Sequence, residues 1–288
     1  MDQNPLVYII LLNYNNYNLT YECISSLKRL SYSNYRILVV DDSPFDTTIE
    51  RLSVDFPDVK LIQNKKNLNY CISFNVGIRA ALEKDAQFIF LVNNDTKNFS
   101  TNYIEQIIYT FNENPRIGLV GSRCYDYDGG VRLGDKPSIR FGIDFNVPTE
   151  GYVIKREVFD KIGLLNENLV IYFEDLDFIF RMKRAGYITK PNLSISFDHL
   201  GGGAVSKKVF SSNYYRIRNS ILMTRKYCGE YSIKWQIKEI KGNLGVHFRK
   251  LLSLTKNGQI LLSFKTIFAI ILGVSAGFLT PKLYIWKE

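Results

Sequence analysis

The sequence is poor in cysteine, tryptophan and histidine. Its 288 residues include four cysteines, two tryptophans and two histidines. The cysteines are far apart and form no Cys-x-x-Cys pair; they are Cys23, Cys71, Cys124 and Cys228. That spacing excludes a cysteine-based zinc site and a redox pair. We therefore expect reduced thiols, as in proteins of the cytosol.

The glycine-rich loops that bind phosphate in many nucleotide enzymes are also missing. No GxGxxG follows the first apolar run, and no GxxxxGK[ST] occurs anywhere in the chain. These absences argue against dinucleotide dehydrogenases and P-loop enzymes. A nucleotide bound here would need another way to neutralise its diphosphate, and a divalent cation held by an acidic side chain can do so.

Long hydrophobic runs are lacking. The apolar stretch at residues 267–279, IFAIILGVSAGFL, would extend about 20 Å as a helix, short of the ~30 Å hydrocarbon core of a bilayer. It predicts a buried or an interfacial helix rather than a membrane span. The first residues, MDQNPLVYIILLNYNN, have no basic region and no small-residue cleavage site, so we expect no signal peptide.

Acidic residues are scarce in the C-terminal part. The whole chain has 37 basic and 28 acidic residues, whereas residues 205–288 have 15 basic and 3 acidic ones, a balance of +12. Such asymmetry predicts an anionic partner, either a membrane surface, a phosphorylated substrate or nucleic acid; a solvated helix face is the simpler alternative. No nucleic-acid-reading motif occurs, so we expect no nucleic acid partner.

The rest of the composition is that of a globular protein, with 46% hydrophobic and 23% charged residues. Apolar runs alternate with helical patterns, which predicts an α/β fold with a doubly wound, mostly parallel sheet flanked by helices. The predicted strands are residues 6–12, 37–40, 59–62, 88–92, 117–120, 152–154 and 194–197. The predicted helices are residues 20–30 with Thr20 as N-cap, 49–56, 73–82, 104–111 and 156–162, with others near 178 and 213.

Three polar clusters follow predicted strands without a gap. They are Asn13-Tyr14-Asn15, Asp41-Asp42 and Asn93-Asn94-Asp95. Ligands of open parallel sheets bind beyond the carboxyl ends of the strands, so the clusters predict a binding crevice, with Asp95 as the natural cation ligand. The alternative for the third cluster is a turn made of residues that favour turns.

Acidic, histidine and arginine side chains in the second half offer further chemistry. Glu174, Asp175 and Asp177 fall in the first turn of a predicted helix after an apolar stretch, where a partly desolvated carboxylate can act as a general base. The alternative is favourable charge at a helix N-terminus. His199 ends a strand before three glycines, and Arg216 and Arg218 could bind phosphates; a structural histidine and a solvated face are the alternatives.

Eight segments, in order along residues 5–228, resemble the inverting glycosyltransferases of family 2, whose fold is called GT-A. The nearest branch is that of rhamnosyltransferase-type enzymes. The segments are LLNYNN (11–16), VVDDSP (39–44), NKKNLNYCISFNVGI (64–78), LVNNDT (91–96), EGYVIKREVFDKIGLLNE (150–167), YFEDLDFIFRMKRAGY (172–187), DHLGGGAVS (198–206) and YYRIRNSILMTRKY (214–227). One departure is Asn69, which stands where many relatives have glycine.

The resemblance implies roles for particular residues. Asp95 and His199 would hold Mn²⁺ or Mg²⁺, and Asp175 would be the general base, with Glu174 and Asp177 holding the acceptor or tuning Asp175. Binding of the nucleotide-sugar would fall to Asn13, Tyr14, Asp41, Asp42, Asn67, Asn75, Asn94, Gly151 and Arg218.

The expected function is transfer of a sugar, with rhamnose as a candidate, from a dTDP- or UDP-sugar to a glycan or lipid-linked acceptor in cell-envelope polysaccharide synthesis. A catalytically silent sugar-nucleotide or glycan-binding protein is the alternative; a sugar-phosphate nucleotidyltransferase would need a glycine-rich first loop.

We expect a GT-A domain at residues 1–228 and a basic helical extension at 229–288. Residues 205–288 would hold the enzyme on the cytoplasmic face of a membrane, or residues 267–279 would pack on protein, including a second copy in a homodimer.

Overall fold

The computed structural model describes residues 4–45, 47–126, 131–133, 138–140, 143–145, 147, 150–200, 209–227, 241–242, 245, 249, 252–253 and 260–280. Cys228, the glycines at 201–203 and most of the predicted extension lie outside these ranges. The chain divides into two compact units. The first holds Met1–Arg140, Asp144–Leu165 and Phe178–Gly201, and the second holds Phe141–Ile143, Asn166–Asp177 and Gly202–Glu288.

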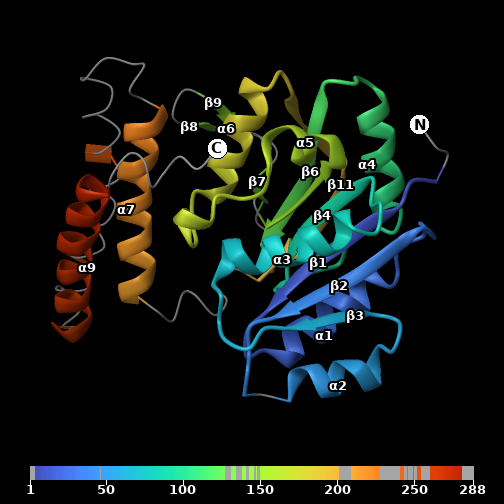
Figure 1. Cartoon of the computed structure of the whole chain (residues 1–288), viewed down its shortest axis with the longest axis horizontal. Helices are drawn as coiled ribbons and strands as arrows, with labels where there is room; N and C mark the ends of the chain where they lie inside the picture. The colour runs from blue at the N-terminus through green and yellow to red at the C-terminus, as the bar shows by residue number, and fades with distance from the viewer. Residues whose placement is uncertain are drawn as a thin grey trace. The chain divides into compact units, whose positions relative to one another are not determined.

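A mixed sheet forms the centre of the first unit (Figure 1). Its strand order is β3-β2-β1-β4-β10-β6-β11-β5, with β7 paired to β6. The first four strands are parallel, β10 runs antiparallel between β4 and β6, and β11 is parallel to β6. The strands are β1 Val7–Asn13, β2 Tyr35–Asp41, β3 Lys60–Gln63, β4 Phe88–Asn93, β5 Thr96–Lys97, β6 Ile117–Asp126, β7 Val131–Leu133, β10 Gly151–Lys155 and β11 Ile188–His199; β8 Ser138–Arg140 and β9 Ile143–Phe145 form a separate pair.

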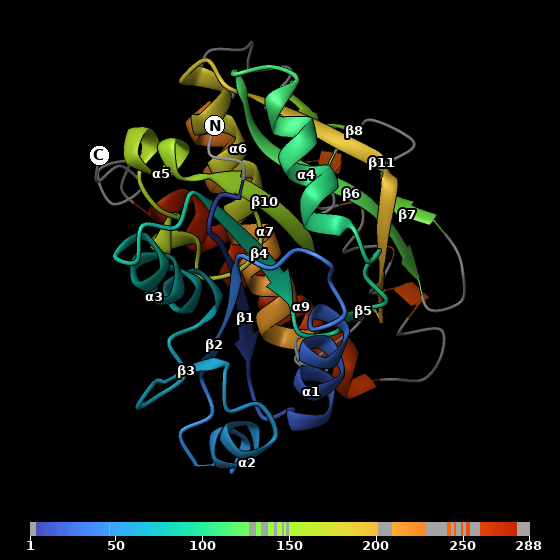
Figure 2. The same cartoon turned by 90° about the vertical axis from the view of Figure 1, so that its right-hand side faces the viewer.

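The central strands β1, β4 and β10 are buried on both faces of the sheet, as their continuous apolar runs predict. Ile9 and Leu11 of β1 belong to the core shared with α1 and α4, whereas Ile10 faces α3. A Cβ at Gly77 of α3 would lie 2.6 Å from Ile10, so glycine is what lets this helix lie so close to the strand. Figure 2 shows helices on both sides of the sheet. They are α1 Tyr17–Leu27, α2 Thr48–Asp55, α3 Tyr70–Leu82, α4 Tyr103–Asn112 and α5 Arg156–Ile162; α6 Glu174–Arg184 begins in the second unit and ends in the first.

The predicted α/β fold is confirmed, with differences at several element ends. Thr20 is not the N-cap of α1: Asn16 caps the helix through Leu19 N–H, and Thr20 is buried inside it. Two strands are longer than their apolar cores predict, because β6 and β11 continue to pair with each other through polar residues as far as Asp126 and His199. Cys23, Cys71 and Cys124 are free thiols, as expected.

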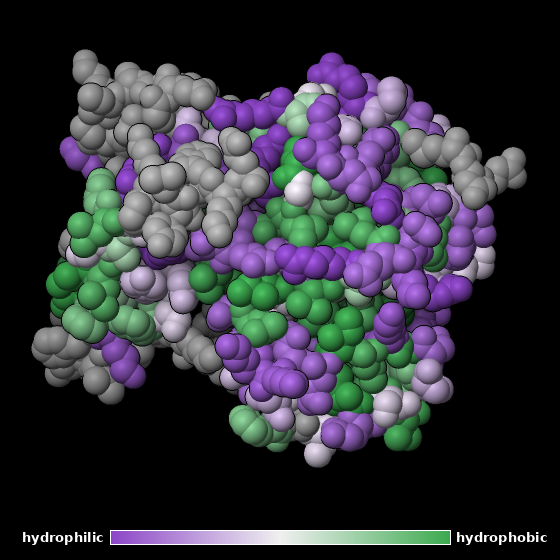
Figure 3. Space-filling model, viewed as in Figure 1, coloured by the Kyte–Doolittle hydropathy of each residue, from purple (hydrophilic) through white to green (hydrophobic). Residues whose placement is uncertain are grey.

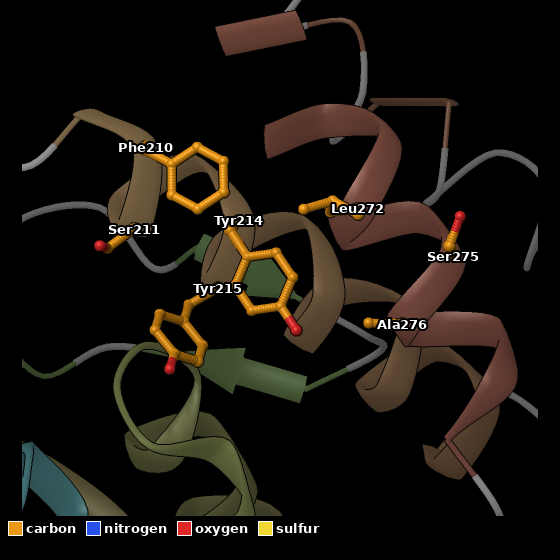
Figure 4. Close-up of a pocket in the computed structure, with 7 residues that line it drawn as sticks. All are labelled: Phe210, Ser211, Tyr214, Tyr215, Leu272, Ser275 and Ala276. Carbon is orange, nitrogen blue, oxygen red and sulfur yellow. The ribbon is translucent and has the colours of Figure 1, made fainter. Parts of the chain in front are cut away.

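Two helices, α7 (Val209–Tyr227) and α9 (Ile260–Leu279), pack together in the second unit. Ile217 and Ile221 of α7 contact Ile270 of α9. A Cβ at Gly273 or Gly277 of α9 would lie within 3 Å of α7 atoms, so these two glycines, four residues apart, allow the close approach. The pair leaves a groove of about 370 Å³ lined by aromatic rings of α7 and by Leu272, Ser275 and Ala276 of α9 (Figure 4).

Helix α9 also carries exposed apolar side chains. Figure 3 shows green side chains gathered at this helix. They include Ile267, Phe268, Ile271, Leu272, Phe278 and Leu279, which are 38 to 78% exposed. Within the described residues, no helix is long and apolar enough to cross a membrane.

Candidate active site

The carboxyl ends of β1, β2 and β4 bring the three predicted polar clusters to one edge of the sheet. Asn13 pairs in register with Asp41, and Leu12 pairs with Asn93. At the buried centre, Asn13 Nδ2 donates to Asp41 Oδ1 at 2.7 Å. Asn94 joins this network through Thr20: its Nδ2 donates to Thr20 Oγ1 at 2.9 Å, and Thr20 Oγ1 donates to Asn13 Oδ1 at 2.8 Å. The clusters thus form one connected polar edge, in which Tyr14 and Asn94 are only half-buried.

Asp42 links this edge to the loop and helix after β3. Asn64 Nδ2 and Ser73 Oγ each donate to its carboxylate at 2.7 Å. Burial raises the pKa of Asp42, and the hydrogen bonds from Asn64 and Ser73 oppose the rise. Asp42 therefore fixes the start of α3 against the end of β2.

Asn67 and Asn75 act on the backbone in this structure. Oδ1 of Asn67 accepts the N–H of Asn69 at 2.8 Å. Asn75 is buried in α3, where its amide exchanges two hydrogen bonds with the backbone of Leu165, at 2.9 and 3.0 Å. Both side chains shape the walls of the edge, and their contact with a donor sugar stays a prediction.

Gly151 begins β10 beside the same edge. A Cβ at this position would lie 3.1 Å from the Phe197 ring and 3.5 Å from the Phe90 ring. Glycine thus lets the strand pass between β4 and β6 without displacing the aromatic core. Its contact with a donor stays a prediction.

Asp95 and His199 meet at the end of the sheet. Antiparallel pairing sets Thr96 of β5 opposite His199 of β11, and Leu200 N–H donates to Asp95 O at 2.9 Å. His199 Nε2 lies 3.1 Å from Asp95 Oδ1, and both residues are buried. They are 104 positions apart in the sequence, and the strand pairing brings them together.

This pair fits a divalent cation that is shared with a substrate. A carboxylate oxygen and an imidazole nitrogen suit Mn²⁺, and nitrogen is a less favoured ligand for Mg²⁺. Among the described residues no group of three His, Cys, Asp or Glu side chains could hold a metal by itself. Two protein ligands suffice where the phosphates of a nucleotide complete the coordination.

The predicted acid cluster lies in the second unit, at the first turn of α6. Asp175 is half-buried, and Leu176 N–H donates to its Oδ1 at 2.7 Å. Glu174 is buried, and no described residue forms a hydrogen bond with its Oε2. Burial, and next the charge of Asp175, raise the pKa of Glu174 to about 8. Glu174 therefore keeps its proton at neutral pH, and Asp175 is the more accessible of the two carboxyl groups.

Asp177 is fully buried and bound to α7. Lys226 Nζ lies 2.7 Å from its Oδ1, and the Tyr227 hydroxyl donates to the same oxygen. Sequence reasoning missed both partners, because their separation of about fifty residues follows no helical or strand period. A lysine beside a tyrosine in a basic helix carries no signal of such a contact.

Arg216 and Arg218, predicted for phosphate, contact the loop before α6. The Arg216 guanidinium lies 3.9 Å from the centre of the Tyr172 ring. Arg218 Nη1 donates to Asn168 O at 2.9 Å and to Asn219 Oδ1 at 2.8 Å. Burial lowers the pKa of the Arg218 guanidinium. Binding of a nucleotide-sugar by Arg218 stays a prediction.

Comparisons with known proteins identify the family of the chain. The family model of Glycosyl transferase family 2 matches residues 8–183. The dTDP-rhamnosyl transferase RfbF of Shigella flexneri is 26% identical over 281 residues, covering 88% of this chain and 90% of that protein. The uncharacterized protein y4gI of Sinorhizobium fredii is 25% identical over 217 residues, which are 65% of this chain but only 23% of that protein.

The fold has a solved counterpart. The mannosyltransferase PcManGT of Pyrobaculum calidifontis, solved with GDP-Man and Mn²⁺, superposes with a TM-score of 0.61 at 14% identity and covers 100% of this chain and 89% of that one. Its likeness shows a GT-A sheet with flanking helices. The family match covers more than half of the chain and includes Asp95 and Asp175. The chain therefore belongs to glycosyl transferase family 2 and is a glycosyltransferase with the GT-A fold.

Proposed function

We propose that this glycosyltransferase is inverting and metal-dependent, and that it transfers a sugar from a nucleotide-diphospho-sugar to a hydroxyl of a glycan or lipid-linked acceptor. The buried Asp95–His199 contact of 3.1 Å carries the proposal, because a carboxylate and an imidazole suited to a divalent cation meet at the carboxyl ends of the strands, where ligands of such sheets bind. A dTDP- or UDP-sugar is the proposed donor. The dTDP-rhamnosyl relative supports dTDP and rhamnose.

Asp95 and His199 would hold Mn²⁺ or Mg²⁺, and the donor set favours Mn²⁺. When bound, the cation offsets the negative charge that develops on a departing nucleoside diphosphate. The PcManGT complex, which contains Mn²⁺, is consistent with this choice. Tyr14, Asn94 and the loops fixed by Asp41 and Asp42 would receive the nucleotide.

Asp175 would act as the general base. Its carboxylate takes the proton of the acceptor hydroxyl, whose oxygen forms the new bond to the anomeric carbon. The bond from that carbon to the diphosphate oxygen breaks on the opposite face, so the configuration inverts. Such proton transfer contributes about 10²–10⁴-fold to the rate. Glu174, protonated at neutral pH, leaves the basic role to Asp175, and buried Asp177 acts through α7 rather than by contact with the acceptor.

A lipid-linked acceptor would be met at a membrane. The six exposed apolar residues of α9, together with the +12 balance of residues 205–288, support peripheral attachment to an anionic cytoplasmic leaflet. A homodimer that covers these exposed apolar residues is the competing arrangement.

A donor panel tests the proposed function. The protein would be incubated with dTDP-, UDP- and GDP-sugars, with and without Mn²⁺, and donor binding would be scored by thermal shift. A donor at 100 times its Kd should add ~2.7 kcal/mol of stability. NMR would then follow sugar release or transfer and the configuration at the anomeric carbon.

Asp95→Ala should abolish the Mn²⁺-dependent shift. Asp198→Asn is the matched control, because Asp198 lies beside His199 but binds Asn98 at 2.7 Å. If the protein binds a donor but neither hydrolyses it nor transfers its sugar, the alternative of a catalytically silent binding protein would be supported. Retention of configuration would overturn the inverting mechanism.

A further inference from the structure

The loop that precedes the acid cluster has an unusual backbone. Val170, Tyr172 and Phe173 have φ of 65°, 67° and 71°, a region that residues with side chains seldom occupy. At Val170, with ψ of −61°, Ile171 N–H donates to Leu169 O at 2.7 Å and closes a three-residue γ-turn of the rare, strained form. None of the three residues is glycine, so other contacts must hold this conformation.

Asn219 of α7 supplies such contacts. Its side chain is fully buried, and Nδ2 lies 2.7, 2.8 and 2.9 Å from the carbonyl oxygens of Leu169, Ile171 and Tyr172. Arg218 Nη1 donates to Asn219 Oδ1, which fixes the amide so that its N–H groups face the loop. One side chain thus binds both ends of the γ-turn and the first left-handed residue after it.

The same face of α7 holds the chain on both sides of Glu174 and Asp175. Ser212 and Arg216, seven and three residues before Asn219, contact the Tyr172 hydroxyl and ring. Lys226, seven residues after it, binds Asp177. These spacings match the period of a helix, so the contacts line one stripe. Glu174 and Asp175 lie between the two anchored points.

We propose that Asn219 is a positioning residue for the general base. It holds the left-handed turn from which α6 begins, and so sets the direction in which the Asp175 carboxylate leaves the helix. Asn219 itself touches no reactant. The catalytic part of this inference rests on the proposed function, whereas the hold on the loop does not.

The test uses three variants of the full chain. Asn219→Ala removes the amide, and Asn213→Ala is the matched control, because Asn213 is buried on α7 and its amide faces Thr266 of α9 at 3.4 Å. The third variant combines Asn219→Ala with Val170→Gly, since glycine takes a positive φ without help. Turnover, donor Kd and amide hydrogen exchange would be measured for each.

Asn219→Ala should lower kcat by about 10- to 100-fold, as expected when a reacting group is misplaced, with donor Kd unchanged. Exchange at Ile171 and Tyr172 should accelerate. The added Val170→Gly should restore part of kcat and slow the exchange, while Asn213→Ala should leave both at wild-type values. Unchanged exchange in Asn219→Ala, or no rescue by Val170→Gly, would overturn the proposal. If the wild-type protein transfers no sugar, the proposed function fails, and the exchange data still decide whether Asn219 holds the loop.

Discussion

At the residue scale, Asn69 adopts a conformation that asparagine rarely takes. Its φ of 69° and ψ of 168° fall in a region that is almost exclusive to glycine. The resemblance to family 2 implies glycine at this position, and the backbone here has a glycine conformation although the residue is asparagine. Asn69 is therefore a source of backbone strain.

Asn69→Gly should stabilise the protein by about 1 kcal/mol. Relief of strain gives ~1–3 kcal/mol, and the greater freedom of glycine in the unfolded chain subtracts ~0.4–1 kcal/mol. Urea unfolding would measure the difference. Asn67→Gly is the control and should destabilise, because the side chain of Asn67 caps Asn69 N–H. A loss of stability in Asn69→Gly would contradict the claim that the backbone of Asn69 is strained.

Glu174 couples the stability of the fold to pH. Its pKa rises from 4.5 in the unfolded chain to about 8 in the folded one, chiefly through burial. The folded protein thus keeps a proton that the unfolded chain releases. The contribution of this group is fully present below pH 4.5 and is lost as pH rises to about 8.

Glu174→Gln removes this titration. The stability of the variant relative to the wild type should therefore increase with pH between 4.5 and about 8, at a slope of at most ~1.4 kcal/mol per pH unit. Thermal unfolding of both proteins across this pH range would show it. A difference in Tm that is independent of pH would mean that Glu174 is ionised throughout.

At the scale of elements, the sequence predicts the strands and helices of the first unit well and their ends less well. Apolar runs such as that of β4 need burial on both faces, and this requirement is readable from residue types alone. The ends of β6 and β11 depend on pairing between polar residues distant in sequence, which no local pattern encodes. The antiparallel insertion of β10 escaped prediction for the same reason.

The candidate site likewise contains residues that a local sequence pattern predicts and residues whose role depends on packing between distant segments. Asp95 and the acid cluster were found because each follows an apolar run or opens a helix. The partners of Asp177 and the role of Asn219 depend on how α7 packs on the loop before α6. Asn219 sits in the helix segment RIRNS, where nothing marks it as buried.

The Asp177–Lys226 contact should stabilise the junction of α6 with α7. Lys226→Met leaves a fully buried carboxylate without this cation, which should cost about 3–5 kcal/mol. Urea unfolding would measure the loss, with Lys241→Met, an exposed position, as control. Adding Asp177→Asn to the Lys226→Met variant should recover part of the lost free energy of unfolding. A change within the error of the Lys241 variant would show that the pair contributes nothing.

At the scale of the whole molecule, the proposed membrane attachment depends on the basic C-terminal part and on the exposed apolar residues of α9. Basic residues near an anionic leaflet contribute ~1 kcal/mol each, and apolar burial adds to this. The protein should therefore sediment with anionic vesicles, and less so in high salt.

Replacing Phe268 and Ile271 by serine should weaken this sedimentation, since both are more than half exposed. Val54→Ser, at an 80% exposed position of α2, should not. Equal recovery in the supernatant with and without vesicles would contradict membrane attachment. A concentration-dependent dimer lost in the double variant would favour the homodimer.

The most direct test of the account is the turnover of Asp175→Asn. This change keeps the size of the side chain and removes its basicity. Donor binding should be unchanged, because Asp95 and the strand edge are intact, and kcat should fall by at least ~10²-fold, the lower range for a lost general base. Near-normal kcat with normal donor binding would contradict Asp175 as the base.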